Sequence, residues 1–562
     1  FIVFIVFIVF IVFINMEVTM LGSINTYNTS KGYGFIINDI GTKVFFHISD
    51  WKPQSIPKQG NNVIFEPGYD QRGRACAKEV DLAVSDNGMS PSMEAISEWD
   101  RDAKEEDTNR YFCSFGYEKG IIKGKKSFII ARKGCGKTAL ALHLDSMNVP
   151  GKLSKYLTFK QFPFNELLIH SDSSYLSSGR FVTVWKYIIY SNICQLMLLN
   201  DNISQRARDL LKSVYERDFQ DTINNNVRKW TGKKFGVSVL TNGFQYEESA
   251  QIVNEPDTLP DKTYVLEKFI IENIDSSDYL ILFDELDDAY VNLSDSELNN
   301  YKNIICGLFK AVADIRYNLN KKCGKKVFPV IFLRDDIYNI LQDPDKGKWR
   351  DLIIGLEWNQ NLIKEMLAYR LSKAIDDGIE IYEFDKIWRA TVNINPIVKS
   401  YGKAITIYQY MTERTFERPR DYVLFLKYSA ELAERYNKIT ISQVEVQNVR
   451  NKISLSLREE LEGELCGLVP EIKEVFDVFI ALGKRIFDFS DFEKAFNEHF
   501  PSGLVGEMSC KDLLCLLFEH SVIGNHYSPN KNDFKYKNSK VKIKYNSKLI
   551  VFLGLNNELN LR

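Results

Sequence analysis

The feature that most constrains this chain is a glycine-bearing loop that lies between a short apolar run and a sequence typical of a helix start. The apolar run ends at Ile130, and the loop reads Ala-Arg-Lys-Gly-Cys-Gly-Lys-Thr from Ala131 to Thr138. Residues 139–144 are Ala-Leu-Ala-Leu-His-Leu, which favours a helix. Between a strand and a helix, the N–H groups of such a loop point inward and the helix N-terminus adds positive potential. The sequence therefore predicts a P-loop in an α/β domain.

Six residues of this loop are expected to bind a nucleotide. Lys137 would reach the β- and γ-phosphates, and the Thr138 hydroxyl would bind Mg²⁺. Ala131 stands where a glycine is usual, but it is small enough for the same turn. The remaining positions are Gly134, Cys135 and Gly136. The alternative interpretation is a glycine-rich turn that binds no ligand.

An apolar run that ends in two carboxylates comes later in the chain. Residues 279–283 are Tyr-Leu-Ile-Leu-Phe, and Asp284 and Glu285 follow. Ligands bind at the carboxyl ends of the strands in parallel sheets, so Asp284 is expected to hold the Mg²⁺ ion. Glu285 is expected to orient or deprotonate the attacking water. Asp287 and Asp288 are interpreted as solvated residues of a helix start.

Two sets of arginines are candidates for phosphate contact. Arg334 follows an apolar run at residues 327–333, and at that strand end it would sense or stabilise the charge of the γ-phosphate. Arg418 and Arg420 flank Pro419 at the start of a predicted helix, where guanidinium groups suit phosphate. For both sets the alternative is a structural salt bridge.

The amino-terminal segment has a different pattern. From residue 19 to about residue 83, short alternating apolar runs are separated by turn residues, which predicts a small all-β barrel. The period of two places Tyr33 and Phe35 on one strand face, and Phe45 and His47 on one face of the next strand. Aromatic side chains on a solvent face stack on bases at about 1–3 kcal/mol each. The alternative is that these rings fill the barrel.

This segment resembles the cold-shock domain, a five-stranded OB-type barrel that binds single-stranded RNA or DNA. The resemblance rests on Lys-Gly-Tyr-Gly-Phe-Ile from Lys31 and Val-Phe-Phe-His-Ile-Ser from Val44. It implies a stacking platform of Tyr33, Phe35, Phe45 and His47, with Lys31 at the phosphates. Thr26 stands at the family's tryptophan and Ile48 at an aromatic position, so a smaller platform and weaker binding are expected.

Residues 107–437 resemble bacterial P-loop ATPases of the additional-strand, catalytic-glutamate class, close to the AAA+ and STAND groups. The resemblance implies that Arg334 is a sensor and that Arg418 and Arg420 form a second sensor on a helical lid. It also implies ATP and Mg²⁺ as cofactors. The spacing from Lys137 to Asp284 is longer than a minimal core needs and suggests an insertion at residues 154–261.

The carboxyl-terminal part is predicted to be a winged helix. Helices are expected at residues 471–482, 489–496 and 511–520, followed by a hairpin at residues 528–548. The hairpin contains seven lysines, and those at 540, 542 and 544 alternate with apolar residues, so one face would pack and the other would be cationic. Phosphate contact and a solvated edge strand protected by lysines are both compatible with this pattern.

Composition narrows the partners and the compartment. The chain has 72 Lys and Arg against 74 Asp and Glu, a net charge of −2, so nucleic-acid binding must rest on local patches. Nine scattered cysteines without a CxxC pair indicate a reducing, cytoplasmic environment. Residues 1–15 are mostly a Phe-Ile-Val repeat and are interpreted as a non-functional tail, since a membrane span needs about 20 apolar residues. No other stretch is expected to be long and apolar enough, so a membrane partner is not expected.

These observations predict a multidomain fold with an N-terminal all-β OB-type barrel, a central α/β P-loop NTPase with a helical lid, and a C-terminal winged-helix-like α+β domain. The expected order is a tail at 1–15, the cold-shock domain at 16–84, a linker at 85–105, the ATPase core at 106–345, the lid at 346–445 and the winged-helix-like domain at 446–562.

The predicted function is ATP binding and hydrolysis coupled to the binding of single-stranded nucleic acid. Two alternatives stay open: a STAND-like nucleotide-gated switch with slow hydrolysis, and a nucleic-acid chaperone with a regulatory nucleotide site. The choice between RNA and DNA also stays open, and a homo-oligomer is compatible with this class of ATPase.

Overall fold

The structure is a computed structural model that describes most of the chain. The described residues are 20–38, 41–53, 55–70, 72–82, 91–160, 162, 164–169, 177–215, 225–227, 237–243, 258–290, 294–376, 378–393, 395–399, 402–504, 508–529 and 531–562. They fall into two compact units. One contains the described residues up to Arg101 together with Trp358–Arg562, and the other is Asp102–Glu357. The expected tail at residues 1–15 lies outside the described residues.

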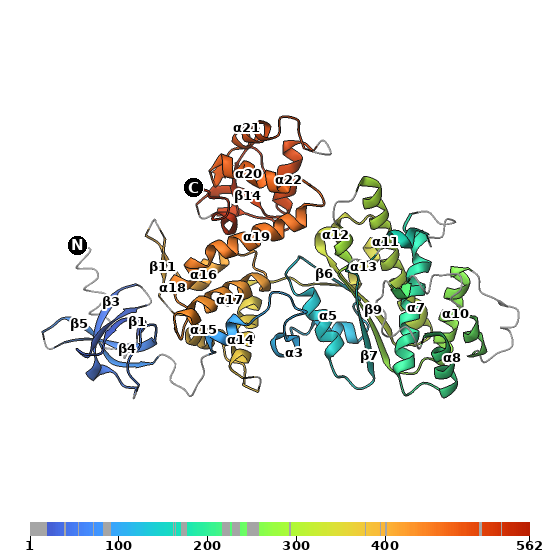
Figure 1. The fold of residues 1–562 in the computed structure, drawn as a ribbon, viewed down its shortest axis with the longest axis horizontal. Coiled ribbons are helices and arrows are strands. Elements are labelled where there is room, and N and C mark those ends of the chain that lie inside the picture. The colour runs from blue at the N-terminus through green and yellow to red at the C-terminus, as the bar shows by residue number, and fades with distance from the viewer. Residues whose placement is uncertain are drawn as a thin grey trace. The chain divides into compact units, whose positions relative to one another are not determined.

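A closed five-stranded barrel forms the amino-terminal part, drawn in blue in Figure 1. Its strands follow the order β1-β2-β3-β5-β4, and residues of alternating strand positions, among them Ile24, Ile36, Phe46 and Val63, fill its interior. The expected all-β barrel is therefore confirmed. The strands are β1 (Met20–Asn28), β2 (Tyr33–Asn38), β3 (Lys43–His47), β4 (Asn62–Tyr69) and β5 (Ala75–Leu82).

Gly34 allows β2 to approach its neighbours closely. A Cβ atom at this position would lie 2.6 Å from the ring of Phe46, and closer still to the carbonyl oxygen of Thr26. Since Phe46 is fully buried and Thr26 belongs to the paired strand β1, neither neighbour has room to move. Only glycine fits here without displacing the barrel core.

The second unit is built on a five-stranded parallel sheet. Its order is β10-β6-β9-β8-β7, so the first strand of the unit, β6, lies between the last two. Helix α5 covers one face of the sheet, and α7 and α11 cover the other (Figure 1). The predicted α/β class is confirmed. The strands are β6 (Phe128–Ala131), β7 (Lys152–Thr158), β8 (Asp278–Asp284), β9 (Val327–Arg334) and β10 (Ile353–Gly355).

Two strands of this sheet differ from the expected layout. β7 begins at Lys152 and occupies the start of the region interpreted as an insertion, residues 154–261. β10 pairs with β6 beyond the expected end of the core at residue 345. Both are edge strands of the sheet. β7 is mostly half-buried and β10 has only three residues, so neither has the continuous buried apolar run that marks β8 and β9.

Helices of this unit pack on the sheet and on one another. The longer ones are α5 (Lys137–Ser146), α7 (Val182–Leu199), α8 (Gln205–Tyr215), α10 (Leu259–Asn273) and α11 (Asp295–Ile315). The shorter ones are α3 (Thr108–Tyr111), α4 (Tyr117–Ile122), α6 (Phe164–Ile169), α12 (Asp335–Ile340) and α13 (Lys346–Trp349).

One helix corrects the expectation that no further stretch is long and apolar enough to cross a membrane. Among the described residues, Gly179–Leu199 meets that criterion by length and composition. However, 72% of the 18-residue apolar window within this stretch is buried inside the protein, where α7 packs against α10 and α11. This packing accounts for its apolar composition.

A helical region follows the sheet in the chain and belongs to the first unit. Its helices are α14 (Gln360–Ile375), α15 (Phe384–Thr391), α16 (Ile407–Thr412), α17 (Pro419–Arg435), α18 (Gln443–Asn448) and α19 (Arg450–Leu465), with a small pair of strands, β11 (Ile397–Val398) and β12 (Ala404–Ile405). The segment expected to be a linker contributes α2 (Met93–Ser97), which packs against α17. Trp99, just after α2, is buried with the Arg370 guanidinium 4.6 Å from its ring centroid.

The carboxyl-terminal part combines three helices with a four-stranded sheet of order β13-β16-β14-β15. The expected three helices are present as α20 (Ile472–Leu482), α21 (Phe489–His499) and α22 (Cys510–Glu519). The strands are β13 (Ile486–Phe487), β14 (Ile523–Ser528), β15 (Lys531–Asp533) and β16 (Lys548–Val551). The hairpin expected at residues 528–548 differs: β14 pairs with β15, and residues 534–547 connect β15 to β16 without forming a strand.

We predict that Gly34→Ala destabilises the barrel by about 1–3 kcal/mol, because the added methyl group overlaps the Phe46 ring. Denaturant unfolding followed by tryptophan fluorescence measures the loss, since Trp51 packs against Phe46. Gly73→Asn is the control, because Gly73 has a left-handed φ of 74° that asparagine tolerates, with open space around it. Equal stability of Gly34→Ala and Gly73→Asn would contradict the close-approach explanation.

Candidate functional site

The P-loop connects the end of β6 to the start of α5. Gly134 and Gly136 have φ angles of 77° and 89°, in the left-handed region that favours glycine, and Gly136 caps α5. A Cβ atom at Gly136 would meet nothing within 4 Å, so the backbone conformation and not crowding requires glycine there. The Lys137 ammonium donates to the carbonyl oxygens of Ala131 at 3.0 Å and Arg132 at 3.2 Å. The Lys137 side chain therefore lies along the P-loop, with its ammonium at the first two residues of the loop.

Asp284 ends β8 with its carboxylate almost fully buried, 2% exposed. It accepts a hydrogen bond from the Tyr156 hydroxyl at 3.0 Å. Burial raises the pKa of the Asp284 carboxyl above its ordinary value, although the nearby Thr138 side chain opposes the shift. The structure thus brings together the two residues expected to hold Mg²⁺.

These two residues fit a magnesium ion. Mg²⁺ in nucleotide sites is held by one or two carboxylates together with the phosphates, and it keeps several waters. A desolvated carboxylate beside a hydroxyl offers such oxygen ligands, and a divalent cation would offset the cost of burying its charge.

Glu285 follows Asp284 in a strained conformation. Its φ of 58° lies in the left-handed region, which is uncommon for a residue other than glycine and is often found at functional sites. The Lys104 ammonium lies 2.5 Å from Oε2 of Glu285, and the Thr158 hydroxyl donates to the same oxygen. The other carboxylate oxygen, Oε1, has no hydrogen-bond or ion-pair partner in the part of the chain that the structure describes.

Sequence reasoning missed three residues around these carboxylates. Thr158 and Tyr156 lie on β7, where Thr158 is in register with Asp284. Recognition of β7 as a sheet strand would have revealed both. Lys104 is separated from Glu285 by 181 positions and lies in a turn before α3, so no local pattern marks it.

Arg334 lies at the end of β9, in register with Ala131 at the start of the P-loop. Its guanidinium is largely buried and donates to Asp336 at 2.6 and 3.0 Å. Asp287 lies 3.7 Å away, so it is an ion-pair partner of Arg334 and not only a solvated residue as expected. The structure therefore places Arg334 at the expected strand end, paired with carboxylates.

Asp335 is a further carboxylate near the P-loop. Burial raises the pKa of its side chain, and Asp336 raises it further, while the charges of Arg132 and Lys137 lower it. The positive groups of the loop therefore act on Asp335, which sequence reasoning did not single out.

Arg418 and Arg420 lie at the start of α17 in the other unit. Arg418 is 4% exposed and its guanidinium lies 2.9 Å from Asp421 and 3.0 Å from Glu460, while Arg420 lies 2.9 Å from Glu460. Burial lowers the pKa of Arg418, but the two carboxylates raise it above its ordinary value. These ion pairs match the structural alternative, and the sensor role remains a prediction.

The barrel presents a cluster of aromatic rings on β2 and β3. Tyr33 pairs with His47 and Phe35 with Phe45 across the two strands, while Phe46 faces the interior. The Tyr33 and Phe45 rings are 5.7 Å apart, and the Phe35 and Phe45 rings are 5.8 Å apart. All three rings are half-buried and His47 is exposed, so the period-two prediction agrees with the observed faces.

Two cations flank this face. The Lys43 ammonium lies 4.4 Å from the centroid of the Phe35 ring, which the sequence did not reveal. Lys31 is exposed in the turn that leads into β2, where its N–H donates to Asn28. Lys43 is therefore positioned to add positive charge beside the rings, and the phosphate contact of Lys31 stays a prediction.

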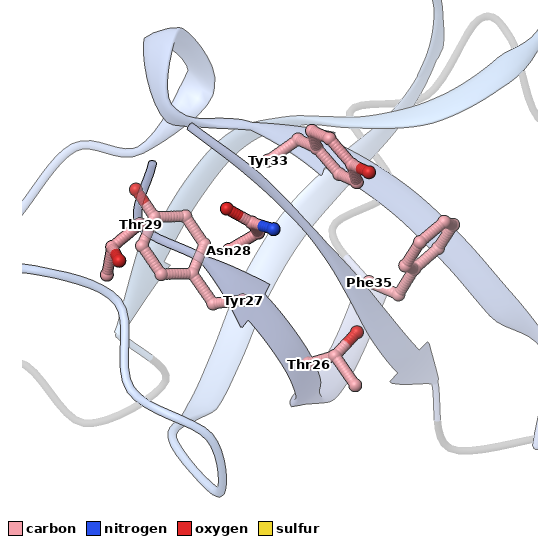
Figure 2. A pocket seen from close by; sticks show the side chains of 6 residues that line it. All are labelled: Thr26, Tyr27, Asn28, Thr29, Tyr33 and Phe35. Atoms are coloured by element: carbon pink, nitrogen blue, oxygen red, sulfur yellow. The ribbon is translucent and has the colours of Figure 1, made fainter. Parts of the chain in front are cut away.

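An open pocket of about 530 Å³ adjoins the aromatic cluster (Figure 2). It is lined by residues of β1, the following turn and β2: Thr26, Tyr27, Asn28, Thr29, Tyr33 and Phe35. Figure 2 shows the Asn28 amide between the Tyr27 and Tyr33 rings in this view. Thr26 is exposed, so its small side chain leaves room where the family's tryptophan would stand.

Two family models match parts of this chain. Residues 20–82 match the 'cold-shock' DNA-binding domain, and residues 361–462 match the FunZ-associated C-terminal helical domain. The first match and the five-stranded barrel confirm that the amino-terminal segment is a cold-shock domain. The second covers α14 to α18 and most of α19.

A curated relative is the putative transposon gamma-delta 80.3 kDa protein of Escherichia coli K12. It is 24% identical over 390 residues, which cover 66% of this chain and 51% of the relative. This chain therefore spans about half the length of that protein.

Three solved structures are also similar to this chain, with low identities and low TM-scores. Cdc6p from Pyrobaculum aerophilum is 12% identical with a TM-score of 0.27, covering 84% of this chain and 97% of its own. The Aeropyrum pernix ORC2 protein is 11% identical with a TM-score of 0.34, covering 83% and 92%. Drosophila ORC bound to DNA is 11% identical with a TM-score of 0.24, covering 84% and 92%. We assign the fold of this chain from its own strand order and from its P-loop, and not from these similarities.

We predict that Asp284→Asn raises the unfolding temperature of the nucleotide- and magnesium-free protein at pH 8. The folded-state pKa of Asp284 lies above its ordinary value of 3.8, so stability falls as the pH rises past 3.8 and stays lower above the folded-state pKa. The gain of the variant should therefore shrink when the pH approaches 4. Thermal unfolding of Asp284→Asn and of the exposed control Asp351→Asn measures this difference. A destabilised Asp284→Asn at pH 8 would contradict it.

Proposed function

We propose that this protein is a cytoplasmic, Mg²⁺-dependent ATPase that binds single-stranded nucleic acid through its cold-shock domain. One observation carries the ATPase part: the side chain of Thr138, which follows the P-loop lysine, lies close enough to the buried Asp284 to lower the pKa of its carboxyl, and Glu285 comes next. A phosphate-binding loop, a hydroxyl and two carboxylates are the groups that nucleotide hydrolysis requires.

The residues of the loop have complementary roles in this proposal. Main-chain N–H groups around Gly134 and Gly136 would bind phosphate oxygens, and Lys137 would leave its two carbonyl partners to reach the β- and γ-phosphates. Thr138 and Asp284 would hold Mg²⁺, which supplies neutralisation of the phosphate charge. Arg334 would add positive charge beyond the end of β9, where it faces Asp336 and Asp287.

Glu285 is the residue that would position the attacking water. Lys104 and Thr158 both contact Oε2, so this oxygen is fixed and Oε1 is left to accept a hydrogen bond from water. A carboxylate held in this way would orient the water and accept its proton during attack on the γ-phosphate. Lys104 and Thr158 are positioning residues in this account.

The same ion pair favours a second candidate function. Lys104 and Thr158 both contact one oxygen of the Glu285 carboxylate, so the side chain has little freedom to move toward an attacking water. Hydrolysis would then be slow, as expected for a nucleotide-gated switch of the STAND type. Turnover of the wild type with and without single-stranded RNA or DNA separates the two: turnover stimulated by strands supports the ATPase, and ATP-dependent assembly with little turnover supports the switch.

The barrel would hold the strand by stacking. The rings of Tyr33, Phe35 and Phe45 lie on one face beside Lys43, which combines base stacking with attraction for phosphates. Since RNA and DNA bases offer the same rings, stacking alone favours neither. A chaperone with a regulatory nucleotide site would use this face in the same way, but its strand binding would be unaffected by Lys137→Ala.

We predict that Lys137→Ala abolishes ATP hydrolysis and weakens ATP binding, because the loop loses its phosphate-binding ammonium. Glu285→Gln should still bind ATP but hydrolyse it at least about 100-fold more slowly, since the amide cannot accept a proton. Phosphate release and equilibrium dialysis with Mg²⁺-ATP measure the two steps. Lys125→Ala, an exposed lysine before β6, is the control. Normal turnover of either variant would overturn the site.

We also predict that Phe35→Ala combined with Phe45→Ala weakens single-strand binding at least about tenfold, because two stacking surfaces are removed. Basal ATP hydrolysis should persist. Fluorescence anisotropy with labelled RNA and DNA oligonucleotides measures the affinity. Tyr317→Ala combined with Tyr436→Ala removes two exposed rings outside the barrel and should bind normally. Unchanged affinity of the Phe35 and Phe45 double variant would exclude the barrel as the strand site.

A further inference from the structure

A concentration of positive charge lies in the carboxyl-terminal domain, outside both sites described above. Residues 531–548 contain seven lysines and one acidic residue, Asp533, so their formal charge is 7 − 1 = +6. The whole chain has a charge of −2. We call these residues the lysine segment.

Most of these lysines have no acidic partner. Lys535 lies 2.9 Å from Glu519 and is half-buried. The other six are exposed, and none forms an ion pair with a carboxylate of the described residues: Lys531, Lys537, Lys540, Lys542, Lys544 and Lys548. Their charge is therefore available to an external anion.

The middle of the segment is held in place by a buried side chain. Asn525 on β14 is fully buried; its amide donates to the carbonyl oxygen of Lys542, and its oxygen accepts from the N–H of Lys544, both at 2.9 Å. The Tyr545 hydroxyl also donates to the carbonyl oxygen of Lys511 at 2.8 Å. These bonds fix the backbone of the segment although it forms no strand.

Packing then directs the lysines outward. Val541, Ile543 and Tyr545 pack against the core of the domain, and the lysines that alternate with them are exposed. Lys540, Lys542 and Lys544 therefore form a row of exposed ammonium groups at alternate positions of the segment.

Protection of a sheet edge does not explain this row. The edge strands are β13 and β15, and Lys531 on β15 is the one lysine of the segment that lies in either of them. Asn525 is paired with β15 on one side and with β16 on the other, so its side chain leaves from a face of the sheet. The lysines that it positions consequently lie over that face and away from the edge.

An exposed aromatic ring adjoins the row. Tyr527 on β14 is 38% exposed, and the ammonium groups of Lys544 and Lys531 lie 5.1 and 5.7 Å from its ring centroid. A ring beside ammonium groups suits a ligand that combines bases with phosphates. An anionic membrane fits less well, because Val541, Ile543 and Tyr545 pack against the core of the domain and do not extend outward as inserting side chains.

We propose that the lysine segment is a second nucleic-acid site, which binds the phosphodiester backbone without sequence preference. Lysines act on phosphates as point charges, and each phosphate that they neutralise releases counterions. The site is independent of the barrel, so a strand captured by the cold-shock domain would gain a further contact on the same chain.

The test compares Lys540→Gln/Lys542→Gln/Lys544→Gln with Lys452→Gln/Lys473→Gln/Lys494→Gln in the full chain. Both triple variants remove the same charge from exposed positions of the same unit, so folding should be unchanged. Each is also combined with Phe35→Ala/Phe45→Ala to remove the contribution of the barrel. Binding of labelled mixed-sequence single strands and duplexes is measured between about 50 and 200 mM salt.

The first variant should bind at least about tenfold more weakly at low salt, and the slope of log K against log[salt] should fall by about 2–3, at roughly 0.7–0.9 per lost phosphate contact. The second should match its parent. Equal affinities and slopes of the two triple variants would overturn the proposal, as would equally tight binding of polyglutamate. If the Phe35 and Phe45 changes have no effect but the lysine changes do, the barrel assignment fails and this one stands.

Discussion

The burial of the Asp284 carboxylate is the constraint on which the central site depends. A carboxylate removed from water needs hydrogen bonds or a cation, and here the Tyr156 hydroxyl donates a hydrogen bond and the Thr138 side chain lies close by. Thr138 comes from the helix after β6, and Tyr156 from β7, on opposite sides of β8 in the sheet order. The parallel sheet brings these segments to one edge, because all its strands end there.

The parts that were predictable from sequence are those encoded by neighbouring residues. The P-loop, the Asp284–Glu285 pair and the aromatic faces of the barrel each lie within a few positions, and short-range periodicity is enough to identify them. The contacts of Glu285 are different. Thr158 required the recognition of β7, whose lysines and half-buried positions hide an edge strand, and Lys104 is brought to the site only by the tertiary fold.

The carboxyl-terminal domain shows how a correct pattern can accompany an incorrect element. Alternation predicted that Lys540, Lys542 and Lys544 face away from Val541 and Ile543, and they do. The hairpin that we inferred from this alternation is absent. The Asn525 side chain forms hydrogen bonds with the carbonyl oxygen of Lys542 and the N–H of Lys544, which a partner strand would otherwise provide. Sequence periodicity therefore predicts which side of a segment is buried, but it does not predict which groups form hydrogen bonds with its backbone.

The ion pair between Lys104 and Glu285 bears on where this protein can be divided. Lys104 lies before α3 and α4, which both precede β6, so a fragment that starts at β6 would lack it. Glu285 would then keep its left-handed backbone but lose its counter-charge. Nucleotide hydrolysis measured on such a fragment would therefore report on a Glu285 carboxylate in a different environment from that of the intact chain.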